Sequence, residues 1–141
     1  MGLEELLRVN LATVLEELGA EGWLPAAAVS DERVSVEAPR KGGAGDLATN
    51  AALVLAKTAG KPPRELGTEL AARLARDPLV RATEVAGPGF VNVHLEPAAF
   101  HRILAEILAA GRGYGRAPAA SKPRVNVEFV SANPTGPLLV S

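Results

Sequence analysis

The sequence contains no cysteine, which excludes disulfide bonds and thiolate chemistry and leaves any zinc site to other ligands. Its only histidines are His94 and His101, too few for a histidine-based metal site, so we expect no bound metal. No apolar run approaches the ~20 residues of a membrane span. Glu4 and Glu5 interrupt the first apolar stretch and argue against a signal peptide. These absences predict a cytoplasmic protein without a membrane partner.

Neither sign of charge dominates the chain. Lysine and arginine number 15 against 16 aspartate and glutamate, a net charge of −1, so the chain is no general binder of polyanions and we expect no DNA partner. A nucleic acid would have to be bound by a local patch. The candidate basic residues, which in most proteins would simply be solvated, are Arg40, Lys41, Lys57, Lys61 and Arg64. With 141 residues, 48% of them hydrophobic, the chain can form one folded domain and a fragment of a second.

Apolar residues recur at helical spacing in four segments. The predicted helices cover residues 2–18, 47–59, 62–77 and 97 onward, the last with an apolar stripe. Gly19 is expected to end the first helix, and Asp46 and Gly60 to cap and end the second, which should be buried. Thr49 and Asn50 fall in the first turns of that helix, where they face a ligand or, more commonly, cap and form internal hydrogen bonds.

Shorter segments alternate between apolar and polar residues and predict strands over 33–37, 80–86 and 90–95. Gly87-Pro88-Gly89 is a turn signal between the last two strands, which we expect to form a hairpin. The predicted fold class is therefore α+β, a small antiparallel sheet packed with about four helices.

The strand over 90–95 carries the candidate binding residues. Val91, Val93 and Leu95 point to one face, which can be buried, and the alternate set Phe90, Asn92 and His94 points to the other. An aromatic ring beside hydrogen-bonding side chains can stack on an unpaired base and read its edge. The plainer interpretation, which the short pattern alone favours, is a core phenylalanine with two solvated polar neighbours.

A composition change divides the chain near its end. Residues 1–112 form the predicted first domain, and residues 113–123, rich in glycine, alanine and proline, form a linker. Residues 125–130 resemble a buried first strand of an α/β domain, followed by a polar turn where such sheets hold nucleotides. We interpret residues 124–141 as the start of such a domain, too short to complete its sheet.

Three segments resemble one family. The tail VEFVSANPTGPL at residues 127–138 is similar to the start of the class I catalytic domain of arginyl-tRNA synthetases. The upstream segments GDLATNAA at 45–52 and AGPGFVNV at 86–93 resemble the N-terminal extra domain of that family. The order and spacing of these segments agree with the family across nearly the whole chain, and the tail motif is the most specific of them.

The resemblance implies roles for particular residues. The family's N-terminal domain binds the D-loop corner of tRNA through an aromatic and an amide two residues apart, which implies that Phe90 and Asn92, with His94 beside them, contact tRNA. The tail motif of the family holds the arginine substrate, which implies this role for Glu128, Ser131 and Asn133, since a carboxylate suits a guanidinium. ATP and arginine would be ligands of the parent enzyme only, with no cofactor in this fragment.

The tail departs from the family where its HIGH signature should follow. Leu139 stands in place of the first signature histidine and Ser141 in place of the glycine. Leucine cannot donate a hydrogen bond to ATP phosphates. We therefore expect no catalytic residue here, but a truncated, tRNA-binding fragment of an enzyme that ligates arginine to its tRNA with ATP. The alternatives are a stand-alone protein–protein interaction module and a nucleotidyl-transfer enzyme assembled with a second chain.

Overall fold

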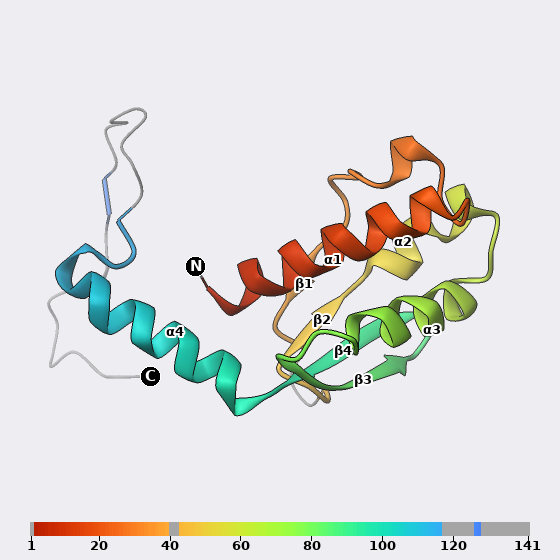
Figure 1. The fold of residues 1–141 in the computed structure, drawn as a ribbon. Coiled ribbons are helices and arrows are strands. Elements are labelled where there is room, and N and C mark those ends of the chain that lie inside the picture. Colours follow the sequence, from red (N-terminus) through yellow and green to blue (C-terminus); the bar gives the residue numbers. More distant parts are fainter. Residues whose placement is uncertain (1, 40–42, 117–125, 128–141) are drawn as a thin grey trace, which may run out of the picture.

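The computed structural model describes residues 2–39, 43–116 and 126–127. A four-stranded antiparallel sheet has the order β1-β2-β4-β3 (Figure 1). The strands are β1 (Val36–Glu37), β2 (Leu47–Thr49), β3 (Val80–Ala86) and β4 (Phe90–Leu95). The helices are α1 (Leu3–Ala20), α2 (Ala51–Ala59), α3 (Pro63–Leu74) and α4 (Pro97–Ala110), with 3-10 turns at Ala26–Ala28 and Gly111–Gly113. The predicted α+β class, with four helices and a small antiparallel sheet, is confirmed.

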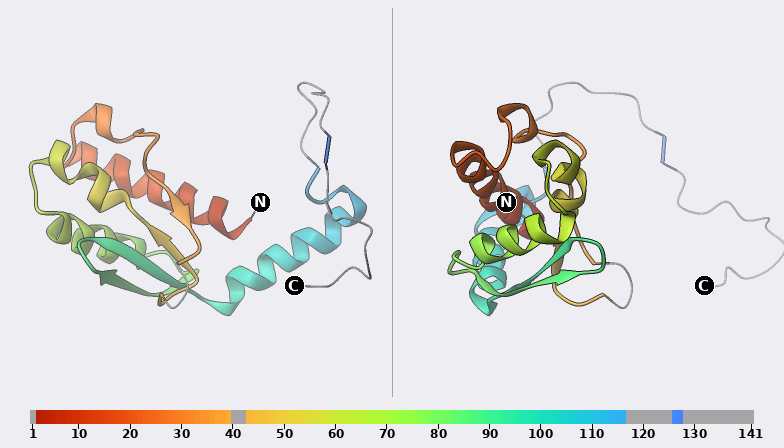
Figure 2. Two further views of the ribbon diagram at one scale, coloured as in Figure 1. Left: turned by 180° about the vertical axis from the view of Figure 1, so that it is seen from behind. Right: turned by 90° about the vertical axis from the view of Figure 1, so that its right-hand side faces the viewer.

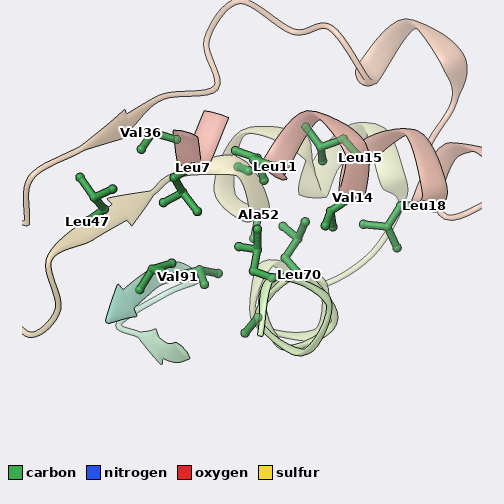
Figure 3. Close-up of a cluster of buried hydrophobic side chains, with 14 of the residues drawn as sticks. Leu7, Leu11, Val14, Leu15, Leu18, Val36, Leu47, Ala52, Leu70 and Val91 are labelled. Atoms are coloured by element: carbon green, nitrogen blue, oxygen red, sulfur yellow. The ribbon is translucent and has the colours of Figure 1, made fainter. Parts of the chain in front are cut away.

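Three of the helices cover one face of the sheet, which we call the inner face. Figure 2 shows α1, α2 and α3 on the same side of the strands. Leu7 and Leu18 of α1 are fully buried in a core cluster that also includes Leu70 of α3 and Val91 of β4 (Figure 3). Burying such side chains stabilises the fold by roughly 1.5–3 kcal/mol each. The core is thus built by the helical spacing of α1 and α3 and by the alternation of β4.

The predicted hairpin of β3 and β4 is confirmed, and its turn is held against α3. Gly89 has a φ of +146°, and a Cβ at this position would lie 2.9 Å from the carbonyl oxygen of Pro63, the first residue of α3. Arg64 donates from Nη1 to the carbonyl oxygen of Gly87 over 3.3 Å. The turn therefore has a defined position at the start of β4.

The start of the second helix is predicted wrongly. Residues 47–49 form strand β2 paired with β4, and α2 begins only at Ala51. Asp46 does not cap this helix: its Oδ2 accepts a hydrogen bond from the Leu95 N–H over 2.8 Å, beyond the last pair of β2 and β4. A partner strand supplied by the tertiary fold therefore outweighs the local helical preference of this segment. The predicted end at Gly60 is confirmed, with a φ of +63°.

Three other boundaries differ from prediction. The third helix, predicted to reach residue 77, ends at Leu74. Gly19 does not end the first helix, which continues to Ala20; the chain turns at Gly22, where φ is +78°. The strand predicted over 33–37 has only its last two residues paired. Arg33 instead binds Asp31 through Nη2 and Oδ2 at 2.6 Å, and this bond lowers the pKa of the Asp31 carboxyl to about 2.

A buried arginine joins α1 to α3. Arg73, only 6% exposed, makes a two-pronged contact with Glu21 at 2.8 and 2.5 Å and binds Glu69 at 2.7 Å. These hydrogen bonds raise the pKa of Arg73, and the bond to Arg73 lowers the pKa of Glu21. Because the cation is fully paired, its burial is tolerated.

Helix α4 leads away from the sheet (Figures 1 and 2). Its predicted apolar stripe is largely solvent-exposed among the described residues, with Phe100, Leu104 and Leu108 all exposed. Ala99, in its first turn, is buried in the core. None of the helices in the described ranges combines the length and apolar character needed to cross a bilayer.

Candidate functional site

A pocket of about 630 Å³ lies where the outer face of the sheet meets the hairpin turn and the first turns of α2. We define the outer face by the side chains of β4 that alternate with its core residues, and by their neighbours in register on β1, β2 and β3. The pocket is lined by residues of β1, β2, α2, the hairpin turn and β4 together with the β1–β2 connection. Those used below are Ser35, Glu37, Ala48, Asn50, Phe90 and Asn92.

The structure brings Phe90 and Asn92 together in this pocket, as the alternation of β4 predicts. Phe90 is 37% exposed, and it lies opposite Ala86 of β3 in the register of the sheet. This small neighbour leaves part of the ring open to a flat ligand. His94 is half-buried on the same face, opposite Ala82, but it does not line the pocket.

Asn92 is a buried amide with unused hydrogen-bonding groups. It is 7% exposed, and its side chain makes no hydrogen bond within the described part of the chain. The backbone of Gly45 crosses beside it, where a Cβ would lie 3.4 Å from the Asn92 Cβ and 3.0 Å from the Val93 oxygen. Within the described residues no side-chain nitrogen or oxygen is both fully buried and without a partner, so the Asn92 amide stays accessible from the pocket, where a ligand with a donor and an acceptor could bind it.

Asn50, which was predicted to lie in an early turn of a helix, holds the segment before β1 at the pocket through two hydrogen bonds. Its Oδ1 accepts from the Ser35 N–H over 2.8 Å, and its Nδ2 donates to the Arg33 oxygen over 3.1 Å. Thr49 accepts from the Ala51 N–H over 3.2 Å. The internal hydrogen-bonding role predicted for both residues is confirmed, and both also line the pocket.

Sequence reasoning did not find Glu37 or Ala48 as pocket residues. Glu37 lies on β1 and Ala48 on β2, so each reaches the pocket through strand pairing between distant segments. A short alternating pattern marks a strand but not its neighbours. Only the register of the sheet could have revealed them.

Two of the candidate basic residues make specific contacts in the structure. Lys61 lies over the Trp23 ring, with Nζ 4.1 Å from its centroid, and binds Glu65 at 3.2 Å. Arg64 lies at the hairpin turn beside the pocket through its bond to Gly87. Arg40 and Lys41, like Glu128, Ser131 and Asn133, lie outside the described residues. Within the described ranges no group of acidic residues and histidines could hold a metal ion.

These features define a class: a small α+β domain with helices on the inner face of its sheet and a pocket at the outer face. The family model described as arginyl tRNA synthetase N terminal domain matches residues 5–95. The chain belongs to this family.

Relatives and a solved structure agree with that assignment. The chain is 55% identical over 130 residues to an arginine–tRNA ligase of Cereibacter sphaeroides, covering 90% of this chain and 22% of the relative. It is 47% identical over 140 residues to the Paracoccus denitrificans ligase, covering 99% and 24%. The fold is similar to Thermus thermophilus arginyl-tRNA synthetase with a TM-score of 0.54 and 27% identity, covering 89% of this chain and 17% of that one. The chain thus spans less than a quarter of the length of these relatives.

Proposed function

We propose that this chain binds tRNA at an unpaired base of the D-loop, as the N-terminal region of an arginyl-tRNA synthetase. The observation that carries the proposal is the pairing of an exposed aromatic ring, Phe90, with the unpartnered Asn92 amide in one pocket. A base has a flat face for the ring and donors and acceptors on its edge for the amide. Membership of the family supports the same interpretation.

The residues around the pocket suit one unstacked base better than a long stretch of nucleic-acid backbone. Arg64, at the hairpin turn, has donors left for a phosphate beside the base. His94 follows Asn92 by two residues on β4, roughly 7 Å along the strand, within reach of an adjacent nucleotide. With a net charge of −1 the domain neutralises few phosphates, so its affinity should be weak and its salt dependence shallow.

Catalysis is proposed for the parent enzyme and not for this chain. The parent would ligate arginine to tRNA with ATP in the cytoplasm, and Glu128, Ser131 and Asn133 would hold its arginine. Leu139 replaces the signature histidine that would contact the ATP phosphates. The purified chain should show no arginine-dependent exchange between ATP and pyrophosphate. Exchange above background from the chain alone would overturn this part of the proposal.

The RNA-binding proposal is tested by titrating a synthetic D-arm stem–loop into the protein. Phe90→Ala should weaken binding by roughly 1–3 kcal/mol, the usual loss of one base–aromatic stack. Asn92→Ala should weaken it less but relax the preference among bases, because an edge contact carries the discrimination. Val91→Ala is the control, since it opens a cavity on the inner face and lowers stability without touching the pocket.

Circular dichroism confirms that each variant is folded before its affinity is compared. If folded Phe90→Ala and Asn92→Ala bind RNA as tightly as the parent protein, the side chains of β4 do not recognise the base. The alternative of a protein–protein interaction module would then gain support.

A further inference from the structure

We propose that Glu37 determines base specificity in this pocket by accepting a hydrogen bond from the exocyclic amino group of the bound base. The pocket would then select an amino-bearing base over uracil. This inference rests on the proposed function, because it assumes that a base occupies the pocket. It adds a recognition group from β1 to the two from β4.

The sheet register places Glu37 across the pocket from Asn92. Glu37 is paired with Ala48, and Ala48 is paired with Asn92, so the three residues form one row across β1, β2 and β4. Neighbouring strands are about 4.8 Å apart, so the backbones of Glu37 and Asn92 are separated by roughly 10 Å. The side chain between them is a single methyl group. All three residues line the pocket, which leaves room for a base over Ala48.

Among the described residues, nothing occupies the carboxylate of Glu37. The residue is exposed, and within the described ranges its side chain makes no hydrogen bond or ion pair. An ionised carboxylate only accepts hydrogen bonds. Adenine, cytosine and guanine each offer an amino group, whereas uracil has no amino group and its one edge donor, N3–H, lies between two carbonyl oxygens that the carboxylate repels. A phosphate would be repelled as well, so the base rather than the backbone should face β1.

The row continues beyond Asn92 to a second carboxylate, which provides a matched control. Glu84 of β3 is paired with Asn92 on its other side and is exposed like Glu37. Glu84 is not among the residues that line the pocket. The two glutamates therefore share charge, exposure and sheet face, and they differ in whether they face the pocket.

The test compares two D-arm stem–loops that differ by one atom group. One carries adenine at a single unpaired loop position and the other carries purine, the same ring system without the amino group. The parent protein should bind the adenine RNA about tenfold more tightly, as expected for one hydrogen bond to a charged group. Glu37→Ala should reduce this ratio to about one. Glu37→Gln should retain a smaller preference, because its carbonyl oxygen still accepts.

The ratio separates base recognition from general charge effects, since both RNAs carry the same phosphates. Glu84→Ala should keep the tenfold ratio. A ratio that survives Glu37→Ala, or that is lost in Glu84→Ala, would overturn the inference. Phe90→Ala should weaken both RNAs equally; if it does so while Glu37→Ala keeps the ratio, only the inference fails. If the folded parent protein binds neither RNA, the proposed function fails and the inference fails with it.

Discussion

Asn50 is the residue whose replacement should most directly connect stability to the pocket. Its side chain makes two hydrogen bonds to the segment before β1, to the Ser35 N–H at 2.8 Å and to the Arg33 oxygen at 3.1 Å. It makes no capping bond to α2, so Asn50→Ala removes only these contacts. At ~1 kcal/mol for each net hydrogen bond, the free energy of unfolding should fall by about 2 kcal/mol.

The same substitution should loosen the pocket. Only Val36 and Glu37 of β1 are paired with β2, so the two bonds of Asn50 are a large part of what holds this edge. Urea unfolding of the full chain, followed by circular dichroism, measures the stability loss. A slope of about 2 kcal/mol/M converts the expected loss into a midpoint shift of about 1 M. D-arm RNA affinity, measured under conditions where the variant is folded, should also decrease.

Asn10→Ala is the matched control for the second effect. Asn10 donates from Nδ2 to Asp77 over 2.8 Å and does not line the pocket. It should lower stability while leaving the RNA affinity of the folded protein unchanged. An Asn50→Ala protein that unfolds at the parent's urea concentration would refute the reasoning. So would an RNA affinity that is insensitive to Asn50→Ala although the midpoint shifts.

Three further substitutions test other parts of the fold. Gly89→Ala should destabilise by about 1–3 kcal/mol in urea unfolding, because its φ of +146° and its 2.9 Å approach to the first residue of α3 exclude a Cβ, whereas Gly87→Ala, in open space, should cost less. Glu21→Gln should be less stable than the parent at neutral pH, because the hydrogen bond from Arg73 lowers the pKa of Glu21. This difference in stability should begin to shrink as the pH falls through about 4.5, the unfolded pKa, and should be lost once the pH passes below the lowered pKa of the folded protein. A difference that stays constant throughout acid titration would contradict this. Leu108→Ser should change the free energy of unfolding by no more than about 0.5 kcal/mol, because Leu108 is 73% exposed. A larger loss would mean that the apolar stripe of α4 is packed against another surface.

The elements that depend on local pattern could be predicted from the sequence. The leucine spacing of α1 and α3, the left-handed end of α2 at Gly60, and the hairpin around Gly87-Pro88-Gly89 all follow from neighbouring residues. The alternation of β4 also assigned Val91 to the core. These predictions succeeded because helical and strand periodicities are properties of a short segment.

The segment 46–50 could not be predicted in the same way. Its residues suit a capped helix locally, but β4 offers backbone partners to residues 47–49 and a free N–H at Leu95 to Asp46. Asn50 likewise bonds to residues 15 and 17 positions earlier. Such partners exist only after distant segments have met, so a local pattern contains no information about them.

That Phe90 and Asn92 share a strand face follows from the sequence, because side chains alternate along any strand, and the sequence motifs also indicate the family to which the chain belongs. The surroundings of these two residues depend on how distant segments pair in the folded protein. Ala48 and Glu37 lie in one row with Asn92 because β1, β2 and β4 pair in one particular register. That register is selected by burial of the inner face, where a slip of one residue would turn Val36, Leu47 and Val93 out of the core.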